Sequence, residues 1–209
     1  MPLPSNNRNR TLTAIAIVVF ILIVDQIIKI AIKTNMALGE QIEVTDWCRI
    51  CFTENKGMAF GMEYVGTMVL SLFRIVAVAF FTYALFNIIR KRAPWGLLVS
   101  WAAVVAGAAG NIIDNFFYGL IFSESGRSLD QVAHFTAFGE GYGGFLTGRV
   151  VDMFYFPLFT WPDWMPLLGG NVFFGAVFNF ADAAISCGGI ALVFFFRHFL
   201  SIDYLFKRA

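Results

Sequence analysis

Residues 175–196 read GAVFNFADAAISCGGIALVFFF, an apolar run that contains an amide, Asn179, and a carboxylate, Asp182. A run of about 20 apolar residues is long enough to cross a bilayer as a helix. A carboxylate inside it costs roughly 2.5–3.5 kcal/mol on insertion scales, so Asp182 should face protein or a water-filled cavity. The three-residue spacing predicts that both polar side chains lie on one helix face. We expect Val150-Val151-Asp152 to supply their partner.

The whole chain has the composition of an integral membrane protein. Of its 209 residues, 58% are hydrophobic and 14% are charged, and the mean hydropathy is +0.71. Four windows are apolar enough to span a bilayer, at about residues 12–33, 67–89, 95–118 and 175–196. The other segments are too short for a separate soluble domain of ordinary size. We therefore predict one domain over residues 1–209, an all-α membrane protein with four transmembrane helices.

Lys and Arg predict how this domain is oriented. The two tails and the link between the second and third windows carry eight of the 15 cations, at Arg8, Arg10, Arg90, Lys91, Arg92, Arg197, Lys207 and Arg208. Because cytoplasmic loops are enriched in Lys and Arg, this side should be cytoplasmic. Both termini are then inside, and the loops of about residues 34–66 and 119–174 are outside.

The first outer loop has the pattern of short strands. Apolar and polar residues alternate around Ile42, Val44, Ile50 and Phe52. This alternation predicts a small β platform on the outer side. The same loop holds Cys48 and Cys51 in a C-x-x-C spacing, which is typical of redox pairs. Residues three apart on a strand point to opposite faces, so the pattern argues against a disulfide between them.

Polar side chains also interrupt the first three windows. Asp25 and Lys29 are spaced for an ion pair that either sets the depth of the helix or supports a site at the outer surface. Arg74 lies about one turn inside the second window, where a guanidinium needs a carboxylate or a lipid phosphate. In the third window Asn111 and Asp114 form another amide and acid pair three residues apart. Two such pairs are more than packing requires.

An aromatic stretch follows Asp152 in the second outer loop. Its rings belong to Phe154, Tyr155, Phe156, Phe159, Trp161 and Trp164. Trp and Tyr are enriched where membrane meets water, so the stretch predicts an interfacial segment on the outer leaflet. Asp152 would then lie where water and lipid meet.

The available side chains narrow the chemistry to carboxylates. The two histidines, His134 and His198, are predicted on opposite sides of the membrane, and neither H-E-x-x-H nor G-x-S-x-G occurs. These facts exclude a histidine-rich metal site and a Ser-His pair. A net charge of +1, without a basic run among aromatics, gives no sign of nucleic-acid binding. Asp152 and Asp182 can instead converge as in an aspartyl hydrolase, where one acid holds a proton while the other deprotonates water.

Five short motifs follow one another along the chain: Asp25-Gln26-x-x-Lys29, Asn55-x-Gly57-x-Ala59-Phe60, Gly110-Asn111-x-x-Asp114, Val150-Val151-Asp152 and Phe178-Asn179-x-Ala181-Asp182. In this order they resemble the motifs of bacterial lipoprotein signal peptidase, also called signal peptidase II. The resemblance covers all four predicted helices and the first outer loop. Each motif alone would be a weak signal, but five in the family's order are a strong one.

The resemblance implies a four-helix aspartyl endopeptidase of the bacterial inner membrane, with its active site at the periplasmic face. It would cut prolipoproteins just before a diacylglyceryl-modified cysteine, among membrane lipids and without metal or cofactor, and we expect a monomer. By matching position, Asp152 and Asp182 take the catalytic dyad. Supporting or substrate-contacting places fall to Asp25, Lys29, Asn55, Gly57, Asn111, Asp114 and Asn179.

The chain departs from the family pattern in two places. Asn115 stands where the family commonly has Arg, so a cation that could meet the substrate is missing there. Our hypothesis is that Arg74 or Arg149 supplies it, and replacement of both by Gln at unchanged KM would contradict this. The second departure is an insertion of roughly 30 residues, at about 119–148. A long insertion of this kind is a lid, a partner surface or a disordered segment.

Two other functions fit parts of the sequence. A small proton- or ion-coupled transporter could use the same acids as a relay, and transporters commonly show repeats or broken helices. Here the polar groups gather toward the outer side, and residues 79–89 contain no acid. A non-enzymatic assembly protein would not explain two acids plus two amides on facing helices.

The dyad predicts a bell-shaped dependence of kcat/KM on pH, because two coupled carboxylates titrate with two macroscopic pKa values. The profile is measured with purified protein and a lipidated prolipoprotein peptide across the acidic and neutral range. A flat profile, with chemistry rate-limiting, would contradict the dyad.

Overall fold

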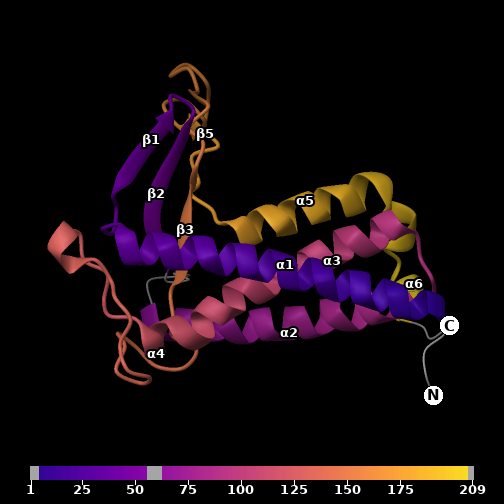
Figure 1. The fold of residues 1–209 in the computed structure, drawn as a ribbon. Helices are drawn as coiled ribbons and strands as arrows, with labels where there is room; N and C mark the ends of the chain where they lie inside the picture. The colour runs from indigo at the N-terminus through magenta and orange to yellow at the C-terminus, as the bar shows by residue number, and fades with distance from the viewer. Residues whose placement is uncertain (1–4, 56–62, 207–209) are drawn as a thin grey trace. The chain divides into compact units, whose positions relative to one another are not determined.

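The computed structural model describes residues 5–55 and 63–206 (Figure 1). The chain divides into two compact units. Unit 1 comprises Met1–Gln26, Met68–Ile113 and Phe180–Ala209, and unit 2 comprises Ile27–Thr67 and Asp114–Asn179. Both units are assembled from segments far apart in the sequence. The prediction of one domain over residues 1–209 stays a prediction.

Three long helices confirm the first three apolar windows. They are α1 (Ser5–Asn35), α2 (Glu63–Arg90) and α3 (Trp95–Ile113). A π-helical turn, η1 (Asp114–Tyr118), and the short α4 (Gly119–Ile121) continue α3. The helical stretches Asn7–Asn35, Ser71–Arg90 and Trp95–Ile121 are long and apolar enough to cross a membrane. Pro94 directly precedes α3, where its fixed φ angle suits the start of a helix.

The fourth helix is shorter than the sequence predicts. The expected helix over 175–196 begins only at Phe180, as α5 (Phe180–Phe195). The cause is a contact distant in sequence: the backbone N–H of Phe178 donates to Phe154 O at 3.0 Å, and Phe154 N–H donates back at 2.7 Å. This bridge holds Phe178 extended, so Asn179 lies outside the helix. The prediction that Asn179 and Asp182 share one helix face is therefore wrong.

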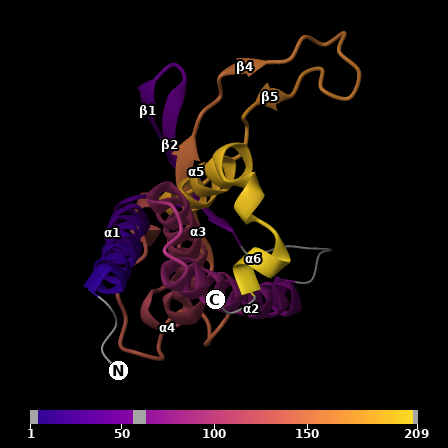
Figure 2. The same cartoon turned by 90° about the vertical axis from the view of Figure 1, so that its right-hand side faces the viewer.

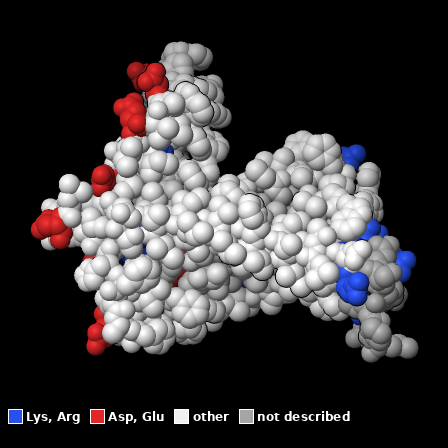
Figure 3. All heavy atoms as spheres, viewed as in Figure 1, with Lys and Arg blue, Asp and Glu red and all other residues white. Residues whose placement is uncertain are grey.

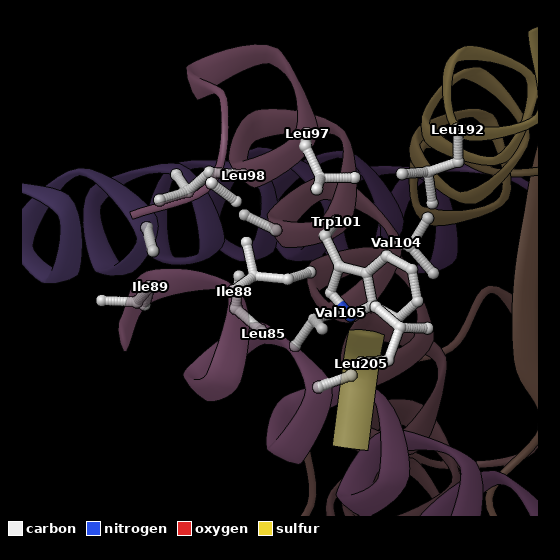
Figure 4. Close-up of a cluster of buried hydrophobic side chains, with 14 residues drawn as sticks. Leu85, Ile88, Ile89, Leu97, Leu98, Trp101, Val104, Val105, Leu192 and Leu205 are labelled. Atoms are coloured by element: carbon white, nitrogen blue, oxygen red, sulfur yellow. The ribbon is translucent and has the colours of Figure 1, made fainter. Parts of the chain in front are cut away.

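Unit 1 has an apolar core built by α1, α2, α3, α5 and the C-terminal segments η3 (Arg197–Phe199) and α6 (Ile202–Phe206). Figure 4 shows Leu85 and Ile88 of α2, Leu192 of α5 and Leu205 of α6 around Trp101 of α3. The indole N–H of Trp101 donates to the carbonyl of Phe81 at 2.8 Å, so its one polar group is satisfied inside the core.

The cationic segments of unit 1 meet at one end. Arg10 donates to the carbonyl of Ala93, Arg92 donates to Asn7 at 3.3 Å, and Lys91 donates to the carbonyl of Tyr204. On the face drawn in Figure 3, Lys and Arg gather at this end. The start of α1, the link between α2 and α3, and the C-terminal segment therefore lie together.

Unit 2 contains the predicted β platform. β1 (Gln41–Thr45) and β2 (Cys48–Asn55) form an antiparallel hairpin, and β3 (Val150–Tyr155) pairs with β2, giving the order β1-β2-β3. The hairpin confirms the alternation in the first outer loop, whereas β3 was not predicted. Cys48 and Cys51 are free thiols, and burial raises the pKa of Cys51.

The later part of the aromatic stretch after Asp152 lies in a second hairpin, whereas Phe154 and Tyr155 belong to β3. β4 (Phe159–Thr160) pairs with β5 (Val172–Phe173), and Figure 2 shows this hairpin apart from β1 and β2. Its loop presents Trp164, which is 79% exposed, and Leu167, which is 99% exposed. The segment 119–148 belongs to unit 2 and contains the short helix α4 and the 3-10 turn η2 (Leu129–Gln131).

Two neighbouring glycines of α5 give a matched test of the packing between α3 and α5. A Cβ at Gly188 would lie 2.7 Å from the carbonyl oxygen of Ser100, whereas a Cβ at Gly189 would meet nothing within 4 Å. Gly188→Ala should lower the free energy of unfolding by about 1–3 kcal/mol. Gly189→Ala should leave it unchanged or raise it by up to about 1 kcal/mol, because alanine favours the helix. Thermal unfolding in detergent checks both, and equal effects would contradict the packing.

Candidate active site

Asp182 lies in the first turn of α5, within unit 1. The side-chain amide of Asn111, on α3, donates to Asp182 Oδ1 at 2.8 Å. Asn111 is buried and Asp182 is half-buried. The first turn of a helix favours a negative charge, because its backbone N–H groups lack helical partners. Helix start and amide together stabilise a carboxylate that is only partly buried.

Asp25 fixes the start of the same helix. Its Oδ1 accepts the backbone N–H of Ala181 at 2.9 Å, and its Oδ2 accepts the amide of Gln26 at 3.2 Å. Gly110 leaves room for this approach, since a Cβ there would lie 2.9 Å from Asp25 Oδ2 and one of the two would have to shift. A carboxylate of α1 thus accepts from an N–H of α5 that has no partner within the helix. Asp25 supports the position of Asp182.

Asp152 lies on β3 within unit 2, and only 5% of its surface is exposed. The fully buried Asn179 donates to Asp152 Oδ1 at 2.6 Å. The carbonyl of Phe178 accepts the N–H groups of Met153 at 3.1 Å and of Phe154 at 2.7 Å. The sequence prediction that Val150-Val151-Asp152 supplies a partner is confirmed for Asn179.

Asp114 contacts β3 at Val151, the residue before Asp152. Its carboxylate pairs with Lys29 Nζ at 2.8 Å and accepts the backbone N–H of Val151 at 3.3 Å. Asp114 and Lys29 are both fully buried, and Asp114 opens the π-helical turn η1. Single π turns inside helices are frequent at functional sites. Lys29 and Asp114, both predicted as site residues, therefore act on the backbone beside Asp152.

Asn115 holds the chain that leads into β3. Its side-chain amide donates to the carbonyl of Gly148 at 2.6 Å, and Gly148 N–H donates to Asn115 O at 3.0 Å. A Cβ at Gly148 would lie 2.0 Å from the carbonyl oxygen of Asp114. The residue that departs from the family pattern therefore closes the 119–148 segment.

A second set of charges surrounds Glu54, at the end of β2. The Glu54 carboxylate accepts hydrogen bonds from Lys33, from Ser125 at 2.7 Å and from Arg149 at 3.1 Å, and its side chain is 2% exposed. Burial alone would raise the pKa of Glu54, but the charge of Lys33 and these hydrogen bonds together hold it below the usual value.

Arg149 belongs to the same set. Its guanidinium pairs with Glu124 as well as Glu54, and it lies 4.8 Å from the ring of Tyr142. The two carboxylates outweigh burial and raise the pKa of Arg149, while burial raises the pKa of Tyr142. The positive charge of Arg149 is therefore already balanced inside unit 2.

The other predicted site residues are placed less fully. Asn55 is the exposed last residue of β2 and is in register with Val150. Arg74 is half-buried on α2. Gly57 lies outside the described residues. Over residues 5–55 and 63–206, no group of three His, Cys, Asp or Glu side chains is spaced to hold a metal ion.

The group of side chains around Glu54, called the charge set here, contains four residues that the sequence did not predict as site residues, namely Lys33, Glu54, Ser125 and Tyr142. Lys33 ends a transmembrane window and Glu54 precedes a family motif, so each reads locally as an ordinary surface charge. Ser125 and Tyr142 lie in the insertion. One signal was available: Lys29 and Lys33 are four residues apart, which places two lysines on one face of an apolar helix.

A multi-pass membrane protein whose polar interior consists of carboxylates and their donors is a candidate aspartic peptidase. The family model described as signal peptidase (SPase) II matches residues 17–198. The lipoprotein signal peptidase of Porphyromonas gingivalis is 49% identical over 183 residues, covering 85% of this chain and 80% of that protein. The lipoprotein signal peptidase of Amoebophilus asiaticus is 34% identical, covering 82% of this chain and 71% of that protein.

A solved bacterial membrane enzyme shares the fold, with a TM-score of 0.58 and 26% identity over 91% of this chain and 94% of that one. This chain belongs to the signal peptidase II family of aspartic peptidases. Its activity is the cleavage of signal peptides from prolipoproteins. The resemblance drawn from the five motifs is confirmed, and the protein is a mostly helical, multi-pass bacterial membrane enzyme.

Acid should remove the stabilising effect of Glu54. The pKa of Glu54 in the folded protein lies below the ordinary value of 4.5. The ionised carboxylate therefore makes its full contribution to the free energy of unfolding above that value, and this contribution is lost as the pH falls through the folded pKa. The stability difference between wild type and Glu54→Gln should therefore be full at about pH 6 and shrink below about pH 4.5.

Thermal unfolding across this pH range measures the difference. Glu43→Gln is the matched control, because Glu43 pairs with Arg49 at 3.5 Å on the same sheet but is 61% exposed. A constant difference between Glu54→Gln and wild type down to pH values well below 4.5 would contradict the role of the Glu54 charge.

Proposed function

We propose that Asp152 and Asp182 are the catalytic dyad of this peptidase, and that it hydrolyses the peptide bond before a diacylglyceryl-modified cysteine. The two acids belong to different units, so the proposal requires both units to work as one peptidase domain over residues 1–209. The substrate is the prolipoprotein of the family, and the lipidated cysteine is the finer part of the proposal.

One observation carries the assignment of the dyad. Asn179 donates to Asp152 at 2.6 Å and precedes Asp182 by only three residues. Three residues of extended chain span at most roughly 10 Å, so the covalent chain keeps Asp182 near the residue that binds Asp152. Asp182 has its own amide donor, Asn111, at 2.8 Å. Asn179, at one end of the Asn179–Asp182 segment, thus holds Asp152, and Asn111 holds Asp182 at the other end.

This arrangement suits acid–base chemistry by two carboxylates. Two acids a few ångströms apart cannot easily both ionise, so one keeps a proton. The ionised acid takes a proton from a water molecule, which attacks the carbonyl carbon of the scissile bond. The protonated acid stabilises the tetrahedral intermediate, and the leaving amine gains a proton as the C–N bond breaks. Asn111 and Asn179 orient the two acids.

The remaining residues hold the dyad or contact substrate. Asp25 and Asp114 position the backbone beside the acids, through Ala181 and Val151. Lys29 balances the charge of Asp114. We assign substrate contact to Asn55 and Gly57, by matching position with the family.

We assign the cation missing at Asn115 to Arg74 rather than Arg149. Arg149 is already paired with Glu54 and Glu124, so meeting a lipid head group would cost it those contacts. Arg74 lies inside the membrane span of α2, where a guanidinium is expensive and therefore usually functional.

We also propose four membrane crossings, with both termini in the cytoplasm and the active site at the periplasmic face of the inner membrane. The meeting of three cationic segments at one end of unit 1 supports this orientation. The exposed Trp164 and Leu167 of the hairpin loop support an interfacial segment in contact with the outer leaflet. In this proposal the protein acts as a monomer, and one chain supplies every residue assigned to the reaction.

Asp152→Asn and Asp182→Asn should each lower turnover at least about 1,000-fold, because each removes a group that transfers a proton. The measurement is cleavage of a diacylglyceryl-modified prolipoprotein peptide by purified, folded protein, with binding of the same peptide followed separately. Binding should persist in both variants. Asp46→Asn, in the exposed turn between β1 and β2, is the control and should cleave like wild type.

Near wild-type turnover in either dyad variant would show that the dyad is misassigned. The same peptide without its lipid should be cut far more slowly. Equal cleavage of both peptides would overturn the part of the proposal that concerns the modified cysteine.

A further inference from the structure

We propose that the 119–148 segment and its contacts with Glu54, Arg149 and Asn115 support β3; this support is called the brace. Glu54, Arg149 and Asn115 are then positioning residues that hold Asp152 for catalysis. This inference rests on the proposed role of Asp152. It gives a function to the insertion and to a buried charge set that the peptidase reaction itself does not use.

The segment is closed at its base by short backbone contacts. Gly148 N–H donates to Asn115 O at 3.0 Å, and Asn115 Nδ2 donates to Gly148 O at 2.6 Å. A second contact lies further along, where Gly143 N–H donates to Gly119 O at 2.8 Å. The two ends of the insertion are therefore fastened together directly before β3 begins.

Glu54 connects the segment to the rest of unit 2. Its carboxylate accepts hydrogen bonds from Lys33 of α1, from Ser125 of the segment and from Arg149, the residue before β3. Lys33 also donates to Ser125 at 2.9 Å. Donors from three separate parts of the chain thus converge on one buried acceptor. Removing that acceptor would leave buried cations without their counter-charge, which is costly.

These contacts fix the register of β3. Glu54 is in register with Val151, next to Asp152, and Arg149 is three residues before Asp152. The Arg149 backbone N–H donates to the Tyr142 hydroxyl at 2.7 Å. A slip of one residue along β2 would turn Asp152 to the opposite face of the sheet. The brace therefore acts on the direction in which the Asp152 carboxylate points.

A positioning role and a substrate-contacting role for Arg149 predict different kinetics. A residue that aligns the dyad acts in the transition state, so its loss lowers kcat and leaves KM unchanged. A residue that holds the lipidated substrate mainly raises KM when it is lost. The pairing of Arg149 with two carboxylates favours the positioning role.

The test compares Glu54→Gln, Arg149→Gln and Arg149→Lys in full-length protein, with a diacylglyceryl-modified prolipoprotein peptide as substrate. Glu54→Gln and Arg149→Gln should each lower kcat about 10- to 100-fold, with KM within about twofold of wild type. Arg149→Lys keeps the charge and should recover part of kcat. The double variant Glu54→Gln/Arg149→Gln should lose less kcat than the product of the two single losses, because both changes break the same Glu54–Arg149 ion pair. Glu43→Gln is the control and should match wild type.

Hydrogen exchange gives a readout that does not depend on activity. The amides of Val151 and Met153 should exchange faster in Glu54→Gln than in wild type, and remain unchanged in Glu43→Gln. Tyr142→Phe removes only the hydroxyl that receives Arg149 N–H, so it serves if the charge variants fail to fold. It should show the same faster exchange and a smaller loss of kcat.

Unchanged kcat and unchanged exchange in Glu54→Gln, or in Tyr142→Phe where that variant is used, would overturn the brace. A raised KM at constant kcat in Arg149→Gln would overturn it in favour of substrate contact. If Asp152→Asn is still active while the exchange result holds, the dyad assignment fails, the catalytic part of this inference fails with it, and only the support of β3 by these contacts stands.

Discussion

A carboxylate buried in a membrane protein needs a donor, and this requirement governs how the chain is built. Each buried acid discussed above has one: Asp25 has the N–H of Ala181, Asp114 has Lys29, Asp152 has Asn179, and Glu54 has Lys33. An ionised acid without such a partner costs several kcal/mol in a medium of low polarity. The contacts that meet this need lie at the first turn of α5, along β3 and between the insertion and the rest of unit 2.

The most consequential of these contacts is the hydrogen bond from Asn179 to Asp152. Asn179 is taken out of the helix by the bridge between Phe178 and Phe154, and its amide then reaches Asp152. Three residues later, Asp182 occupies the first helical turn, where negative charge is favoured. One short segment therefore serves a strand acid and a helix acid, although the two acids are 30 residues apart in sequence.

Local patterns predicted the long helices and the hairpin, because hydropathy and alternation are properties of neighbouring residues. The start of α5 at Phe180 was missed because Phe178 is held by Phe154, a partner 24 residues earlier. The motifs pointed to the acids and to their amides. The charge set around Glu54 was missed for the same reason as α5, since Lys33, Ser125 and Arg149 come together only through the fold.

The central claim is that Asp152 and Asp182 meet, and cross-linking tests it most directly. In a background with Cys48, Cys51 and Cys187 changed to Ser, the double variant Asp152→Cys/Asp182→Cys would be oxidised in the membrane. Because two carboxylates that meet can have Cα atoms further apart than the about 7 Å that a disulfide requires, a second sample is treated with a short bifunctional thiol reagent. The account predicts near-complete cross-linking of this pair by one treatment or the other, and none in the control variants that carry only one of the two cysteines. A 152–182 pair that neither treatment links in folded protein, under conditions that link a known close pair, would contradict the account.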